Sequence, residues 1–341
     1  MYASISDITV IDLAITSVCN ARCMDCARWW VDDGGRLYHN PADTHTNHHW
    51  PWNTLCDHLD VLTHIRSVLI VGNAGDPMSH PNIADVCEWM CRRWPNVTIV
   101  LDTNGSLGTA DTFRRLRSAG DVAFRFAVDG LEHTNHIYRR RVPWHRVEHN
   151  IRQWHDIGGD ATLKTIDFPW NEADRPAIKA WADSMGWTWH LDARWNPDID
   201  QKILDQKDEA PGTWPWPLEE GRDWRKHVGQ QIDRWVAKGR PMRPDCKQQG
   251  GDVLYINHDH TVWPCCYWSN SQYVQWEVQK KHIQHMQRQA EPNWNSLDHR
   301  SLEDILAHPI MRGVEKFWQG SDIDSTNSIC MHQCGGCSSR D

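Results

Sequence analysis

Three cysteines stand close together near the start of the chain: Cys19, Cys23 and Cys26. They follow an apolar, strand-like run over residues 8–15, so their spacing of four and then three residues falls in a loop that leaves a strand. Cysteine thiolates are the usual ligands of iron–sulfur clusters, and a cubane has four irons to bind. Three local cysteines therefore predict a cubane with one iron left for a ligand that is not a side chain. A zinc knuckle, or three unrelated core cysteines, is the alternative that the spacing alone leaves open.

The composition is typical of a soluble globular protein: 341 residues, of which 40% are hydrophobic and 24% are charged, enough for one large domain and a smaller one. No run is long and apolar enough for a membrane span, and the N-terminus lacks a signal-peptide pattern, so we expect a cytoplasmic protein with no membrane partner. Twelve cysteines in a chain of this kind favour metal binding over a disulfide scaffold. The net charge of −9 argues against a nucleic-acid partner.

Residues 1–195 alternate between strand-like and helix-like patterns. Five such βα units and a sixth strand predict an α/β fold with a parallel sheet. Six units would not close an eight-stranded barrel, so we expect a partial, open (βα)6 barrel of the TIM type, with its active site at the carboxyl ends of the strands. The cysteine loop falls at that end. The expected strands are 8–15, 67–71, 97–101, 122–128, 161–166 and 187–191, and the expected helices are about 52–65, 81–93, 109–118, 143–157 and 172–185.

Later strand ends also carry residues suited to binding a small molecule. After the second strand, Gly75 allows a close approach of the backbone and the carboxylate of Asp76 can bind an ammonium group. The third strand ends in Asp-Thr-Asn-Gly at 102–105, the fourth runs into Asp-Gly at 129–130, and a basic segment follows at 138–141. Taken singly, each is explained equally well by an ordinary turn.

The spacing C-x3-C-x2-C after a first strand, with these segments in this order, resembles the radical S-adenosylmethionine (SAM) enzymes. In that family the open iron of a 4Fe-4S cluster binds the amino and carboxylate groups of SAM. Reductive cleavage of SAM gives a 5′-deoxyadenosyl radical, which abstracts a hydrogen atom from the substrate. The resemblance implies that Cys19, Cys23 and Cys26 hold this cluster. It also implies SAM contacts at Gly75, Asp76, Asn104 and Arg140, with Arg139 as the second choice for the SAM carboxylate.

Some positions depart from the family pattern. Asp76 stands where glutamate is commoner, and Ala127 replaces a serine that often helps to hold SAM, so that role is not carried over. Asp25 stands where the family often has an aromatic residue that packs against adenine. Trp29 or Trp30 could take over this packing. Residues 31–50 form an insertion that we interpret as a substrate lid.

The composition changes at about residue 196, and we expect a linker and a helix over 196–240 and a small α+β domain over 241–341. A hairpin over 253–266 and a cysteine-rich tail resemble the SPASM/twitch extension of radical SAM enzymes, which implies an auxiliary 4Fe-4S cluster. A zinc site is the alternative. The expected ligands are Cys246, Cys265, Cys330 and Cys334, with Cys266 or Cys337 as possible replacements.

The resemblance implies an oxidoreductase that takes electrons from an external reductant such as flavodoxin or ferredoxin. We expect it to oxidise or crosslink a side chain of a peptide or protein. The segment before the first strand is short for a leader-binding domain, so we expect a separate protein to recognise a precursor peptide. Dehydrogenation of a small aminoglycoside-like or sugar-like molecule is the alternative. A non-catalytic iron–sulfur electron carrier or a zinc-stabilised binding protein is the alternative from another class.

Overall fold

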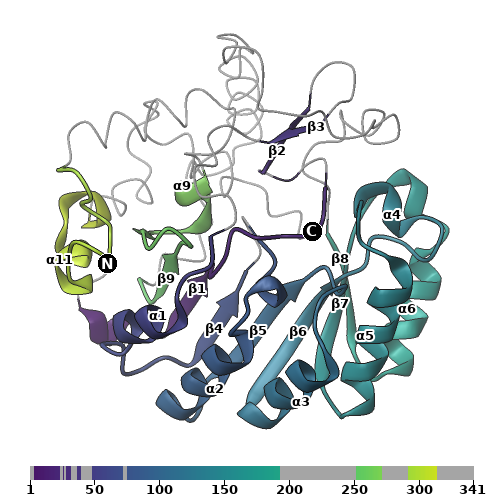
Figure 1. Cartoon of the computed structure of the whole chain (residues 1–341), viewed down its shortest axis with the longest axis horizontal. Coiled ribbons are helices and arrows are strands. Elements are labelled where there is room, and N and C mark those ends of the chain that lie inside the picture. The colour runs from purple at the N-terminus through teal and green to yellow at the C-terminus, as the bar shows by residue number, and fades with distance from the viewer. Residues whose placement is uncertain are drawn as a thin grey trace, which may run out of the picture. The chain divides into compact units, whose positions relative to one another are not determined.

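Two compact units make up the chain, one of residues 12–214 and one that combines residues 1–11 with 215–341. A computed structural model provides the structure, and no helix in its described part is long and apolar enough to cross a membrane. The described residues, coloured in Figure 1, are 4–23, 26, 28–31, 37–39, 48–71, 75–192, 251–270 and 291–312.

The larger unit is built on an open sheet of six strands (Figure 1). Their order follows the chain, and each pair from the second strand to the sixth is parallel. The partial, open barrel predicted from the βα repeat is therefore confirmed. The strands are β1 (Val10–Leu13), β4 (Ser67–Ile70), β5 (Thr98–Thr103), β6 (Asp121–Ala127), β7 (Asp160–Ile166) and β8 (Thr188–Asp192).

The expected helices also occur, and Figure 1 shows them along one side of the sheet. The first ends at Leu59, earlier than expected, because the chain then turns Leu62 and Ile65 into the core. The longer helices are α1 (Trp52–Leu59), α2 (Ile83–Arg93), α3 (Ala110–Ala119), α5 (Trp144–Asp156) and α6 (Arg175–Ser184). The shorter ones are η1 (Ile5–Asp7), η2 (Pro77–Ser79), α4 (Asn135–Tyr138) and η3 (Pro169–Asn171).

One face of the sheet supplies the apolar core between sheet and helices. On β6, every second side chain is buried, and Phe124 meets Phe113 of α3 at 5.8 Å and Trp154 of α5 at 4.8 Å between ring centroids. Side chains alternate between the two faces of a strand, so the residues between these buried ones point away from the helices.

The face away from the helices carries charged side chains from five strands, which we name the charged row. Arg125 of β6 donates two hydrogen bonds to the carboxylate of Asp102 on β5, one of them 2.6 Å long. Lys164 of β7 lies 2.8 Å from a carboxylate oxygen of Asp192 on β8. Parallel strands are usually apolar on both faces, so this row is unusual for the fold. Its members are Asp12, Asp102, Arg125, Lys164 and Asp192.

Asp12, on β1, is the member of the charged row that has no ion-pair partner among the described residues. Burial, followed by the nearby charge of Asp102, raises the pKa of Asp12 to about 7, although the charge of Arg125 opposes this change. The folded protein therefore keeps a proton between about pH 4 and pH 7 that the unfolded chain has lost. Stability from this group is present at low pH and is lost as the pH rises through that window, at most about 4 kcal/mol in total.

Asp12→Asn is expected to remove this pH dependence, because an amide does not titrate. The melting temperature of the variant, measured anaerobically against wild type, should rise relative to wild type between about pH 5 and about pH 8. A difference in melting temperature that stays constant over this range would contradict the raised pKa.

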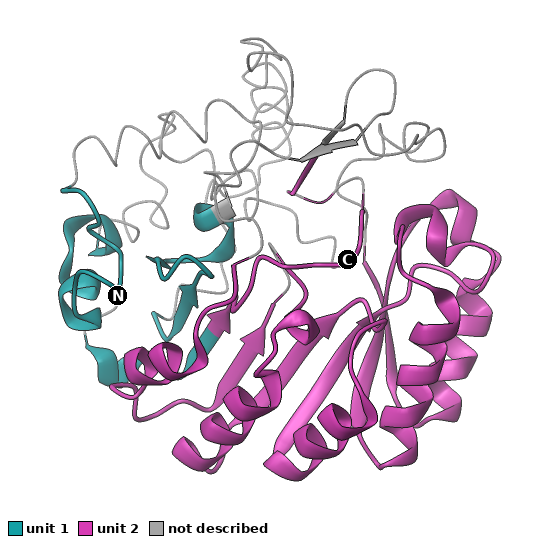
Figure 2. Ribbon diagram, in the orientation of Figure 1, with its two compact units in different colours: residues 1–11, 215–341 teal, residues 12–214 magenta. Residues whose placement is uncertain are grey.

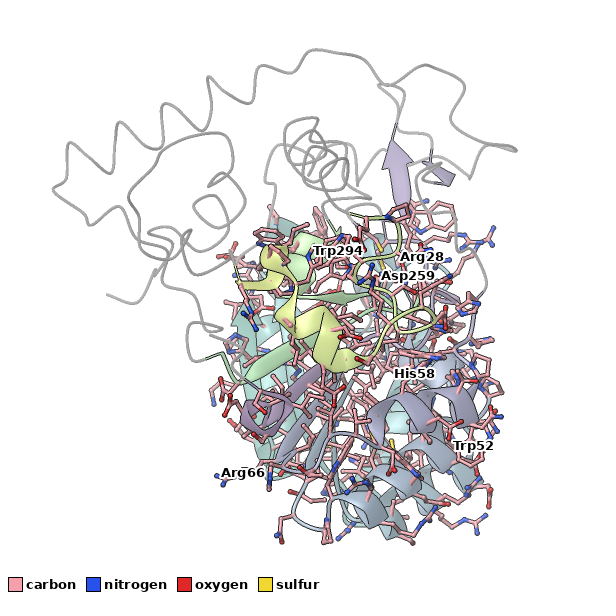
Figure 3. The ribbon with its side chains drawn as sticks, turned by 90° about the vertical axis from the view of Figure 1, so that its left-hand side faces the viewer. Arg28, Trp52, His58, Arg66, Asp259 and Trp294 are labelled. Carbon is pink, nitrogen blue, oxygen red and sulfur yellow. The ribbon has the colours of Figure 1, made fainter. Side chains whose placement is uncertain are left out.

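The smaller unit contains the hairpin expected from the sequence. Strands β9 (Val253–Ile256) and β10 (Val262–Trp263) pair antiparallel, with Trp263 opposite Tyr255. Helices α9 (Cys266–Asn270) and α11 (Leu302–Ala307) complete it. Trp294, labelled in Figure 3, stacks on His308 at 4.6 Å, just after α11. In Figure 2 this unit is teal and the larger unit is magenta.

Candidate functional site

The cysteine loop, residues 18–28, leaves the sheet beyond the carboxyl end of β1. Short backbone hydrogen bonds turn the chain here: the amide of Cys26 donates to the carbonyl of Cys23 at 3.2 Å, and that of Trp29 donates to the carbonyl of Cys26 at 2.9 Å. The chain then enters an antiparallel pair of β2 (Trp29–Val31), which ends where the expected insertion over 31–50 begins, and β3 (Leu37–His39), which lies within it. The loop therefore brings three thiols to the end of the sheet where the active site was expected.

The three thiols influence one another electrostatically. Burial raises the pKa of Cys19 to about 12, and the charges of Asp76, Cys23 and Cys26 contribute to this. Burial raises the pKa of Cys23 to about 11, although the nearby guanidinium of Arg139 opposes the change. Both thiols therefore hold their protons in the metal-free protein. Metal ligation requires thiolates, so loading of the site must release protons.

The donor set fits a cluster better than a single metal ion. Among the described residues, no three His, Cys, Asp or Glu side chains converge tightly enough to hold one metal ion. Thiolates on one zinc ion must all lie about 2.3 Å from it. In a cubane each cysteine binds a different iron, so the sulfurs remain further apart.

Gly75 allows the segment after β4 to lie against the chain that leads into the cysteine loop. A Cβ at this position would lie 2.4 Å from the carbonyl oxygen of Thr16 and 2.7 Å from that of Val18. The next amide, of Asp76, donates to the same Val18 carbonyl at 2.8 Å, and the hydroxyl of Ser79 donates to it at 2.7 Å. This close approach is to the protein's own backbone, and the contact of Gly75 with SAM stays a prediction.

Gly75→Ala is expected to push the start of the cysteine loop out of place, because the neighbouring atoms are backbone and cannot rotate away. Iron bound per chain after anaerobic reconstitution should fall towards about half of wild type, the amount left when only the auxiliary cluster is bound. Gly186→Ala is the control, since its Cβ would meet nothing within 4 Å although its φ of +73° is strained for alanine. Equal iron contents in the two variants would refute the positioning role of Gly75.

Asp76 joins the ends of two strands. Its carboxylate accepts hydrogen bonds from the amide of Met78 at 3.0 Å, the hydroxyl of Thr103 at 2.9 Å and the amide of Asn104 at 2.8 Å. Burial raises the pKa of Asp76, and these donors lower it. The residue predicted to bind the SAM ammonium group thus also fixes the position of the Asn104 backbone. Thr103, which the sequence did not single out, belongs to this arrangement.

Asn104 points towards the first cysteine. Its side-chain amide donates to the oxygen of Asn20 at 2.9 Å and approaches the sulfur of Cys19 at 3.9 Å. Ser106 completes a ring, because its hydroxyl donates to Asn104 at 2.6 Å and accepts from Asn20 at 2.8 Å. Sequence reasoning found Asn104 but missed Asn20 and Ser106. A polar residue directly after the first cysteine was the available signal for Asn20.

Arg139 lies beside the second cysteine. It forms a 2.6 Å ion pair with Asp129, whose side chain is 0% exposed, and another guanidinium nitrogen lies 3.8 Å from the sulfur of Cys23. The second oxygen of Asp129 accepts from the amide of Ile166 at 2.7 Å. Arg140, the first choice for the SAM carboxylate, accepts a 3.0 Å bond from the amide of Arg22 through its carbonyl. The basic segment therefore supports the cysteine loop from a strand end far along the chain.

Two arginines of the cysteine loop also have defined places. The guanidinium of Arg22 lies 4.2 Å from the centroid of the buried Trp29 ring. Arg28, labelled in Figure 3, is buried and donates to the carbonyl of Cys19 at 3.3 Å. Trp29, proposed from the sequence to pack against adenine, therefore already carries a cation on one face.

Of the cysteines expected to bind an auxiliary cluster, the structure describes only one of the first-choice set. Cys265 follows β10 directly, and Cys266, a possible replacement, begins α9. The other expected ligands lie outside the described residues: Cys246, Cys330 and Cys334, together with the alternative Cys337.

Comparisons with known proteins agree on the class of enzyme. Residues 13–182 match the family model of the Radical SAM superfamily. The "AdoMet-dependent heme synthase" of Methanosarcina barkeri is 23% identical over 157 residues, a match that covers 46% of this chain and only 39% of that protein. The chain therefore spans well under half of this curated relative.

Two solved structures with a similar fold illustrate the comparison. Streptococcus suis SuiB bound to S-adenosylmethionine aligns with a TM-score of 0.54 and 11% identity, over 92% of this chain and 68% of SuiB. The structure of anSMEcpe with bound AdoMet aligns with a TM-score of 0.52 and 11% identity, over 91% of this chain and 83% of that one. Together with the three-cysteine loop at the end of an open parallel sheet, these matches show that the chain belongs to the radical SAM superfamily. Membership implies a 4Fe-4S cluster and SAM as cofactors.

Proposed function

We propose that this protein cleaves SAM reductively at a 4Fe-4S cluster held by Cys19, Cys23 and Cys26, and that it oxidises or crosslinks a side chain of a peptide or protein. The observation that carries the proposal is the loop of three thiols at the carboxyl end of the sheet, with hydrogen-bond donors aimed at two of its sulfurs. When bound, the cluster and SAM supply the 5′-deoxyadenosyl radical that removes a hydrogen atom from the substrate.

The chain's own residues hold and orient this site. Asn104 and Arg139 place hydrogen-bond donors near Cys19 and Cys23, which stabilises the thiolates that a bound cluster requires. Gly75 and Asp76 fix the segment after β4 against the loop. In this proposal the same residues, Gly75, Asp76 and Asn104, together with the side chain of Arg140, contact SAM.

A peptide or protein substrate is supported by the proteins that share the fold. SuiB bound to the precursor peptide SuiA aligns with a TM-score of 0.56 over 91% of this chain, and anSMEcpe with AdoMet and a Cp18Cys peptide aligns with a TM-score of 0.52. Dehydrogenation of a small aminoglycoside-like or sugar-like molecule is the other outcome that the experiment below allows.

The proposal includes an auxiliary 4Fe-4S cluster bound by Cys246, Cys265, Cys330 and Cys334, which would accept the electron left on an oxidised substrate. It also includes a flavodoxin or ferredoxin as the external reductant. In this proposal the enzyme is located in the cytoplasm. A fully cysteine-ligated cluster suits electron transfer, because no iron is left open for another ligand.

The decisive experiment is anaerobic reconstitution followed by incubation with SAM and dithionite. We expect 5′-deoxyadenosine to form in proportion to enzyme. Candidate precursor peptides and amino sugars are then added separately, and a mass loss of two hydrogens in one of them identifies the substrate class. Absence of 5′-deoxyadenosine from protein that carries a full cluster would sink the proposal, and oxidation of only the amino sugars would overturn its peptide part.

A further inference from the structure

The charged row lies near the cysteine loop and on the same sheet. Asp102 precedes Asn104 by two residues, and strands rise by about 3.3 Å per residue, so Asp102 lies roughly 7 Å along the chain from the residue that approaches Cys19. Arg125 sits directly opposite Asp102 in the register of β5 and β6. A substrate that reaches from the loop along the face of the sheet opposite the described helices would therefore meet this row.

A gain in the stability of the folded protein does not explain why the charged row consists of charged side chains. Removing charges from water costs free energy that an ion pair recovers only in part, so apolar residues of similar size are often equally stable or more so. The row is also accessible, since the side chains of Asp102, Arg125, Lys164 and Asp192 are between 24% and 34% exposed. Charged groups kept at such a cost near an active site are candidates for ligand binding.

Four side chains of the charged row form two ion pairs, and one carboxyl group of the row has no ion-pair partner among the described residues. Asp102 is neutralised by Arg125, and Asp192 by Lys164. Asp12 has no such partner, and its oxygen Oδ1 is buried without a hydrogen-bond donor. A buried hydrogen-bond acceptor without a donor destabilises the folded protein. A ligand that supplied a hydrogen-bond donor would remove this cost in free energy.

We infer that the charged row binds a cationic group of the substrate, such as an ammonium, and that the carboxylate of Asp12 is its direct partner. This inference rests on the proposed function, because it names the chemistry of the substrate for that same site. An ammonium group satisfies both requirements of Asp12, since it supplies hydrogen-bond donors and the opposite charge.

The groups around Asp12 set how its binding depends on pH. Strand β4, a neighbour in the sheet, presents the uncharged Leu69 on this face, and among the described residues the charges of Asp102 and Arg125 act on Asp12. Burial holds the pKa of Asp12 at about 7, so its carboxylate forms between pH 6 and pH 8. A cation bound beside it should therefore bind more tightly as the pH rises, and should lower that pKa in return.

The test uses n-butylammonium as the probe, with n-butanol as its uncharged counterpart, on the anaerobically reconstituted full chain without SAM or reductant. The dissociation constant is measured by saturation-transfer NMR. For wild type we expect the affinity for n-butylammonium to rise about tenfold between about pH 6 and pH 8, as Asp12 ionises. For Asp12→Asn we expect about tenfold weaker binding at the higher pH and no pH dependence.

Controls separate the role of Asp12 from general effects. Asp160→Asn changes an exposed carboxylate on β7 of the same sheet and should bind the probe as wild type does. His190, which contacts Asp192, is present in every variant, so the comparison isolates Asp12. Asp12→Ser serves as a second variant if the amide disturbs folding, with iron content as the check.

Three results would overturn the inference. The first is that wild type does not bind n-butylammonium, and the second is that the Asp12 variants bind it as tightly as wild type does. The third is that the affinity of wild type for n-butanol has the same pH dependence as its affinity for n-butylammonium. Because no SAM is present, none of these depends on radical chemistry. If wild-type protein with a full cluster formed no 5′-deoxyadenosine from SAM and dithionite, that result would instead refute the proposed function.

Discussion

Replacing Cys19, Cys23 and Cys26 together by alanine is expected to abolish 5′-deoxyadenosine formation and to halve the bound iron. Each thiol is a ligand of the same cluster in the proposed function, so the triple variant leaves that cluster without a side-chain ligand. With an auxiliary cluster in place, iron per chain after reconstitution should fall from about 8 to about 4. Iron and sulfide analysis, with chromatography of the SAM products, measures both effects.

The matched control removes three other thiols of the same unit. Cys56, Cys87 and Cys91 lie on α1 and α2, and the first two are buried. Their triple alanine variant should keep the iron and SAM cleavage of wild type. Continued 5′-deoxyadenosine formation by the first variant would refute the ligand assignment. A fall from about 4 irons to none would instead make the C-terminal cysteines a zinc or structural site.

Arg139→Gln is expected to destabilise the protein by about 3–5 kcal/mol, because it leaves the buried carboxylate of Asp129 without its cation. The same change removes a positive charge from beside Cys23. A positive charge favours the reduced form of a cluster, so the reduction potential of the SAM-binding cluster should fall. Thermal unfolding and an EPR-monitored redox titration measure the two effects separately.

The control is Arg93→Gln, which removes one partner of an ion pair with Asp60, a residue whose side chain is 67% exposed. Exposed pairs contribute about 1 kcal/mol or less, so this variant should melt close to wild type. Asp129→Asn combined with Arg139→Gln should recover part of the stability, since no buried charge remains. Recovery of stability without recovery of the potential would separate the structural role of Arg139 from its effect on the cluster. An unchanged potential in Arg139→Gln would rule out that effect.

The fold could be predicted from the sequence because its signals are local. Each strand is a short apolar run and each helix an amphipathic one, and a repeated βα pitch permits few topologies. The position of the cysteine loop followed from the same rule, since it comes directly after the first strand. Among the described elements, α1 ended earlier than expected, where Leu62 and Ile65 fold into the core, and the first strand was shorter than the expected 8–15.

The interior of the site could not be predicted in the same way, because it depends on contacts between distant strand ends. The role of Asp76 as a ligand contact stays a prediction, but the bonds that its oxygens accept from Thr103 and the Asn104 backbone could not be foreseen. Arg139 was ranked below Arg140, and only the three-dimensional structure places it between Asp129 and Cys23. Asp12 looked like one polar residue in an apolar strand, and its significance depends on neighbours two and three strands away.

The contacts that shape the cysteine loop have a consequence for how the protein is made. Cys19 meets a partner 85 positions further along the chain, and Cys23 meets one 116 positions further along. The cysteines therefore leave the ribosome well before the segments that arrange them. A nascent chain that ends before Arg139 presents three unorganised thiols to its surroundings, exposed to oxidation and to adventitious metals. Cluster insertion is thus expected to follow completion of β6 and the segment after it, and cells that make this protein must keep those thiols reduced until then.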